Sequence, residues 1–192
     1  MCPGHRFVPA FPALAAAVKN TGQADRLPDD YARKETRMKK TLILLAALAA
    51  PALAAAPVPY PQGYRAWTHV KSMVIAPGHA LYEAFGGIHH LYANPKALAG
   101  YKSGRFADGS VIVFDLLEAK SADNTVQEGA RKVLGVMHKD AKKYAETGGW
   151  GFEGFKGDSK TERAVAGNAA KACFGCHEPQ KDKGYVFSAW RK

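Results

Sequence analysis

The sequence lacks any apolar run long enough to cross a bilayer, and it has only 3 cysteines among its 192 residues. Its main apolar stretch, residues 42–50, is about half of the roughly 20 residues that a membrane-spanning helix needs. This absence argues against an integral membrane protein. Lysine and arginine are scattered along the chain, although the formal net charge is +10. We therefore expect no nucleic-acid partner, because nucleic-acid binding uses a clustered basic patch or stripe.

A secretion signal is present, but it lies inside the chain. Residues 38–40 read Met-Lys-Lys, the apolar stretch follows, and small residues lead to an Ala-x-Ala cleavage site ending at Ala54. The pattern predicts a signal peptide over residues 38–54 and export to the periplasm. Because a signal normally begins a chain, we expect residues 1–37 to reflect a mis-annotated gene start or a disordered extension. Residues 55–192 then suit a single domain.

The most informative stretch lies towards the C-terminal end. Cys173-Phe174-Gly175-Cys176-His177 has the C-x-x-C-H spacing of a haem c attachment sequence. Two thiols at this spacing can bond the two vinyl groups of one haem, and the adjacent histidine can ligate the iron. A structural zinc site would need four ligands, and a thioredoxin-like motif would open a helix after an early strand. The sequence predicts one covalent haem c held by Cys173 and Cys176, with His177 as the iron ligand.

No methionine follows this motif to serve as a second axial ligand of the kind that raises the potential of electron-transfer cytochromes. Met73 and Met137 lie in strand-like apolar runs, where core packing is the favoured interpretation. Within residues 55–192, the histidines before the motif are interpreted as surface or satisfied core residues: His69, His79, His89, His90 and His138. His89 and His90 are adjacent, so on a strand they would point to opposite faces. We expect an iron held by His177 alone, with its other face open to a small ligand.

Short apolar runs separated by turn residues predict a mainly β (α+β) fold. Strands are expected over residues 67–75, 88–93, 110–117, 133–139 and 150–155, with a short helix over 95–101 and another over 164–176. The result is an antiparallel sheet with short helices and a C-terminal helix that carries the haem motif. This pattern argues against the four-helix bundle of ordinary cytochromes c prime.

Several short motifs follow one another along the exported part of the chain. They are Tyr-Ala-Asn-Pro at 92–95, Asp-Gly-Ser-Val at 108–111, Lys-Asp at 139–140, Gly-Trp-Gly-Phe at 149–152, the haem motif and Tyr-Val-Phe at 185–187. This order resembles the cytochrome P-460 family. The resemblance implies a mostly β fold, often a homodimer, and a five-coordinate haem with His177 as proximal ligand.

The family has two functional branches, and individual residues distinguish them. Cytochromes P-460 proper oxidise hydroxylamine and carry a lysine bonded to the haem, whereas cytochromes c prime-beta bind nitric oxide and carbon monoxide behind an aromatic cap. Matched to the family, the lysine position is Phe114 and the proton-transferring acid falls near Gly135. Phe85 with Phe114 resembles the two-phenylalanine cap. An apolar cap has no hydrogen-bond donor for a polar ligand, so it favours neutral diatomic gases.

The sequence therefore favours a gas-binding cytochrome over an enzyme, and two alternatives stay open. One is a redox enzyme that oxidises hydroxylamine or reduces peroxide; the family motivates it, and Phe114 and Gly135 oppose it. The other is simple electron transfer with a redox partner protein, which the missing methionine opposes. For Phe85 and Phe114 themselves, ordinary core packing is the competing interpretation.

Overall fold

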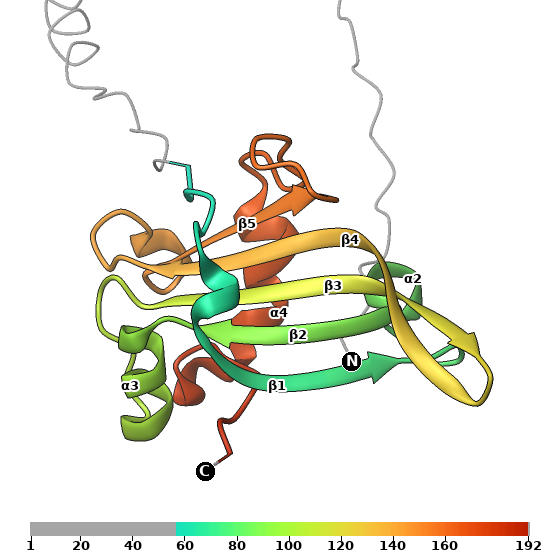
Figure 1. The fold of residues 1–192 in the computed structure, drawn as a ribbon. Coiled ribbons are helices and arrows are strands. Elements are labelled where there is room, and N and C mark those ends of the chain that lie inside the picture. The colour runs from blue at the N-terminus through green and yellow to red at the C-terminus, as the bar shows by residue number, and fades with distance from the viewer. Residues whose placement is uncertain (1–56, 192) are drawn as a thin grey trace, which may run out of the picture. The chain divides into compact units, whose positions relative to one another are not determined.

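The computed structural model describes residues 57–191 and contains one five-stranded antiparallel sheet (Figure 1). The strands lie in sequence order: β1 (Thr68–Ile75), β2 (Gly87–Ala93), β3 (Val111–Ala122), β4 (Thr125–Lys139) and β5 (Trp150–Lys156). The predicted antiparallel, mainly β fold is confirmed. The expected signal peptide at 38–54 and the extension at 1–37 lie outside the described residues. Within residues 57–191, none of the helices has both the length and the apolar character needed to cross a membrane.

The β3–β4 hairpin extends well beyond the two strands expected at its base. Pairing continues to Ala122 opposite Thr125. Asp123 and Asn124 form the turn with φ of 50° and 58°, a left-handed conformation that Asp and Asn tolerate better than most residues. The final five residues of β3 are exposed, and they are polar residues and alanines, so they show no alternation of large apolar side chains. That explains why the sequence pattern ended the strand early.

The start of helix α3 (Pro95–Ser103) is determined by a local cap. The helix begins after Asn94, whose side chain accepts a hydrogen bond from the Ala97 N–H, and it has Pro95 in its first turn. The predicted helix at 95–101 is thus confirmed and runs slightly longer. Three further short helices are η1 (Tyr64–Ala66), before β1, α2 (Tyr82–Phe85), which leads into β2, and η2 (Ala145–Thr147), between β4 and β5.

The C-terminal helical segment begins and ends later in the chain than predicted. Helical structure comprises the π-helical turn η3 (Ala170–Phe174), α4 (Gly175–His177) and η4 (Glu178–Lys183). The predicted first turns instead bind the edge of β5, where the Ala164 N–H donates to the Gly154 carbonyl at 2.6 Å. Glu153 then accepts from the backbone N–H groups of residues 165 and 166. These contacts hold Ala-rich residues in a turn, against their helix propensity.

Each face of the sheet packs against a different part of the chain. On one face, Val58 and Tyr64 from the N-terminal segment pack against Val113 and Val136. On the other face, Ile112 and Phe152 pack with Cys173 and Phe174 of the haem motif segment. We call this second side the motif face. Figure 1 shows η1 and the C-terminal helices on opposite sides of the sheet.

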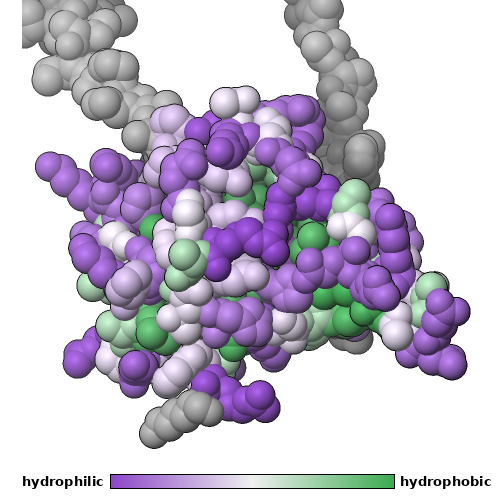
Figure 2. Space-filling view, in the orientation of Figure 1, coloured by the Kyte–Doolittle hydropathy of each residue, from purple (hydrophilic) through white to green (hydrophobic). Residues whose placement is uncertain are grey.

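The side of the molecule seen in Figure 2 is mainly hydrophilic. Apolar residues appear there only in small patches between hydrophilic ones (Figure 2). This view has the orientation of Figure 1, in which the C-terminal helices lie behind the sheet.

Candidate functional site

Strand register shows which side chains share the motif face. One row across the sheet joins Ala93, Ile112, Met137 and Phe152, and these residues pack together with the motif segment. Side chains alternate along a strand, so the rows two residues away lie on the same face. The next row is Leu91, Phe114, Gly135 and Gly154. The row after that includes His89, Leu116 and Val133.

His177 is oriented as a metal-ligating histidine would be. Its Nδ1 lies 2.7 Å from the Tyr185 carbonyl oxygen. A carbonyl can only accept, so Nδ1 carries the proton and donates, which leaves Nε2 as the atom able to bind iron. The ring lies between Phe152 and Phe187, with centroid distances of 4.9 Å to each. Burial lowers the pKa of His177 and favours the neutral imidazole, the form that binds metals.

The two cysteines of the motif differ in their surroundings. Cys173 is partly buried against the apolar cluster of the motif face, whereas Cys176 is exposed. Burial raises the pKa of the Cys173 thiol to about 11, with smaller contributions from Glu153 and Cys176. Cys173 is therefore a protonated thiol at neutral pH.

The proposed cap residues are brought together, although they are distant in sequence. Phe85 ends α2 and Phe114 lies in β3, and their rings meet edge to face with centroids 5.8 Å apart. Lys132 of β4 donates from Nζ to the Gly86 carbonyl at 2.7 Å, which ties the end of α2 to the sheet.

The backbone after α2 passes very close to β3. A Cβ on Gly87 would lie 2.1 Å from the Leu117 carbonyl oxygen, so this position has no room for a side chain.

Gly135, the position matched to the family's acid, lies directly beside Phe114. The two residues are partners in the β3–β4 register, and a Cβ on Gly135 would lie 3.3 Å from the Phe114 Cβ. Gly135 is itself paired with Gly154 of β5, so two neighbouring positions of the motif face carry no side chain. The flanking aromatic rings and the donor set of Cys173, Cys176 and His177 fit a flat, apolar haem group.

His89 is a candidate that the sequence did not distinguish from the other histidines. Its side chain is 4% exposed, its ring centroid lies 4.6 Å from that of Phe114, and its Nδ1 has no hydrogen-bond partner among the described residues. Burial, with smaller effects of His90 and Lys71, lowers the pKa of His89 to about 4. Only the sheet register could have shown that His89, rather than the adjacent His90, lies on the motif face.

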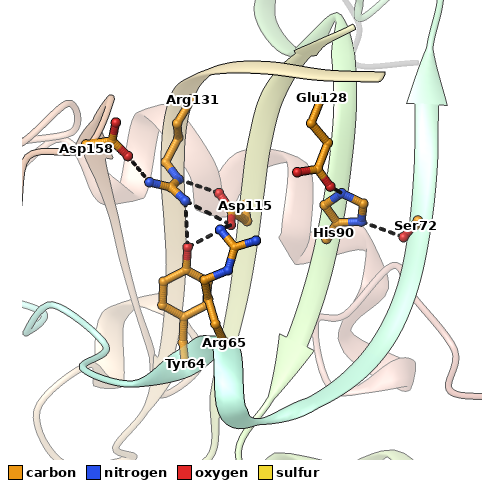
Figure 3. Close-up of polar contacts among 8 residues, drawn as sticks. All are labelled: Tyr64, Arg65, Ser72, His90, Asp115, Glu128, Arg131 and Asp158. Carbon is orange, nitrogen blue, oxygen red and sulfur yellow. Dashed lines mark hydrogen bonds and ion pairs between the residues drawn. The ribbon is translucent and has the colours of Figure 1, made fainter. Parts of the chain in front are cut away.

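His90, Met137 and Met73 differ from His89 in their contacts or exposure. His90 contacts Ser72 and Glu128, with 2.6 Å between the bonded atoms in each case (Figure 3). This agrees with the prediction that His89 and His90 point to opposite faces. Met137 is partly buried on the motif face, as expected. Met73 was expected in the core but is 43% exposed, because β1 is an edge strand.

On the opposite face, a buried carboxylate organises a polar network (Figure 3). Asp115 is fully buried and accepts from Arg131 Nε at 2.6 Å and from the Tyr64 hydroxyl at 2.7 Å. Arg131 also donates to Asp158. Burial and the contact with Asp115 raise the pKa of Tyr64, and Asp115 raises that of Arg131. These groups lie on the face away from the haem motif and join β3, β4 and η1.

Comparison with known proteins adds one finding. The family model described as Cytochrome P-460 matches residues 61–188. No curated protein matches the chain. The matched range contains all five strands, the two phenylalanines of the proposed cap and the complete C-x-x-C-H motif.

Proposed function

The chain belongs to the cytochrome P-460 family, a family of haem c cytochromes, and from this premise we propose that it is an exported gas-binding protein. In this proposal, one haem c is attached through Cys173 and Cys176, and Nε2 of His177 ligates the iron. The ligand is nitric oxide or another small diatomic gas, bound behind Phe85 and Phe114. When bound, the haem would supply an iron centre able to take up that ligand.

The hydrogen bond and ring contacts of His177 support its role as the single protein ligand of the iron. The Tyr185 carbonyl fixes the ring and its tautomer, and such a hydrogen bond raises the basicity of a ligating imidazole. The contacts with Phe152 and Phe187 restrict the ring further. His177 is thus held ready to bind iron through Nε2.

The observation that carries the proposal is the contact between Phe85 and Phe114 on the motif face. Two aromatic rings packed edge to face form an apolar barrier that small neutral gases can pass more easily than ions or hydrated ligands. Phe114 lies next to the row that packs against the motif segment, so the cap and the haem-binding residues share one side of the sheet.

Phe114 and Gly135 disfavour hydroxylamine oxidation. Phe114 has no nucleophilic nitrogen to bond the haem, and Gly135 has no carboxylate to move a proton. These positions are adjacent in the sheet, so both groups that the resemblance associates with that chemistry would belong to one small region. In this chain that region is occupied by a phenyl ring and a bare backbone.

The test uses the holoprotein, produced with haem-attachment machinery and reduced without oxygen. We expect stoichiometric formation of a nitric oxide adduct and negligible hydroxylamine-dependent reduction of an electron-acceptor dye. Sustained turnover of hydroxylamine would overturn the proposal. Export is tested separately by mass spectrometry of the periplasmic protein, which should begin just after residue 54; an N-terminus within residues 1–37 would contradict it.

A further inference from the structure

A buried polar side chain, His89, lies beside Phe114 of the proposed ligand site. Its ring packs against Phe114 at an interplanar angle of 34°, and both residues lie on the motif face. The side chain is almost fully buried, and Nδ1 still has no hydrogen-bond partner among residues 57–191. Buried polar atoms in proteins are nearly always paired, so an unpaired one calls for a functional explanation.

The surroundings keep this imidazole neutral. Burial is the main cause, and the charges that act on the ring are those of His90 from β2 and Lys71 from β1, both of which oppose protonation. The side chains beside it on β3, Phe114 and Leu116, are apolar. A neutral imidazole has one N–H donor and one acceptor nitrogen. His89 can therefore offer a hydrogen bond at a place where a charged side chain would be unstable.

We propose that His89 is the specificity-determining residue of the ligand site and that it hydrogen-bonds to the bound ligand. The inference rests on the proposed function and deepens it. An all-phenylalanine wall would favour neutral gases alone, whereas His89 extends binding to small ligands that accept a hydrogen bond. Fluoride bound to the ferric protein is the simplest probe of this second class, because it accepts hydrogen bonds strongly.

The experiment compares four holoproteins: the wild type, His89→Phe, His89→Gln and His90→Phe. The phenylalanine variant keeps an aromatic contact with Phe114 and removes the N–H, and the glutamine variant restores a donor. His90→Phe is the matched control, since it makes the same change one residue away on the opposite face. Two quantities are measured: the C–O stretching frequency of the ferrous carbon monoxide adduct, and the dissociation constant of ferric fluoride.

For His89→Phe we expect a C–O stretch at higher wavenumber than in the wild type, because a donor near the ligand oxygen weakens the C–O bond. Its fluoride dissociation constant should rise about five- to tenfold, the usual contribution of one hydrogen bond. His89→Gln should reverse part of both changes, and His90→Phe should match the wild type. If His89→Phe does not fold, His89→Leu removes the donor equally and should show the same two shifts.

Identical stretching frequencies and fluoride affinities in the wild type and the donor-less variant would overturn the role of His89. The proposed function would survive that result, because the carbon monoxide adduct would still form. Failure of the wild type to form any adduct would instead overturn the proposed function itself, and the inference with it.

Discussion

Acidification should destabilise the folded protein through His89, and replacing this residue should remove that effect. The pKa of His89 is lowered from 6.5 to about 4 in the folded state. The unfolded chain therefore binds the His89 proton more tightly than the folded chain does. The stability that the neutral His89 ring contributes is fully present above pH 6.5 and is lost as the pH falls towards 4. With about 1.4 kcal/mol for each pKa unit, the total is about 3 kcal/mol, and about 2 kcal/mol is lost by roughly pH 5.

The assay is guanidinium unfolding of the holoprotein at about pH 7.5 and about pH 5, followed by far-UV circular dichroism. The wild type should lose about 2 kcal/mol more of its unfolding free energy between these two conditions than His89→Phe does. Burial also lowers the pKa values of His138 and His177, but both groups are present in both proteins, so their effects cancel in the comparison.

His90→Phe is again the control, and it should keep the His89-dependent loss of stability. Equal losses in the wild type and in His89→Phe would refute the reasoning, because they would mean that the folded state accommodates a protonated ring at this position. The burial argument that supports the role of His89 in ligand binding would then lose its basis.

Three further predictions follow from named contacts. Phe114→Ala should open the cap and speed carbon monoxide association by about tenfold, equivalent to about 1.4 kcal/mol of barrier; an unchanged rate in flash photolysis would remove Phe114 from the cap. Lys132→Met breaks the hydrogen bond to the Gly86 carbonyl, so it should also speed association and lower the unfolding free energy by about 1 kcal/mol. Asp115→Ala leaves Arg131 without its buried partner and should lower the unfolding free energy by about 3 kcal/mol in guanidinium titrations, with a loss below about 1 kcal/mol contradicting the buried network.

Much of the fold could be predicted because the buried strands carry their own signals. The β-branched and aromatic run in β3 and the Pro95 helix start are local features, and the structure confirms both. The exposed hairpin ends of β3 and β4 carry no such signal. The helix expected from residue 164 is wrong at its start because the Glu153 side chain and the Gly154 carbonyl take the backbone N–H groups that a helix would use.

The candidate site could be predicted only where it rests on local sequence. The spacing of Cys173, Cys176 and His177 can be recognised without a structure, and the roles assigned to these residues stay predictions. The prediction that Phe85 and Phe114 form one cap depended on the family resemblance. The contact between their rings is visible only in the folded structure. His89 could not be singled out, because its position beside Phe114 depends on strand register and its missing partner depends on packing.

The absorption spectrum of the ferrous holoprotein, recorded before and after addition of nitric oxide, tests the central claim most directly. The account predicts a high-spin spectrum of ordinary haem c that shifts on addition of the gas, as expected for His177 as the only protein ligand behind an apolar cap. A markedly red-shifted ferrous band would indicate a modified haem and favour a hydroxylamine enzyme. A low-spin spectrum insensitive to nitric oxide would show a second side chain on the iron and contradict the account.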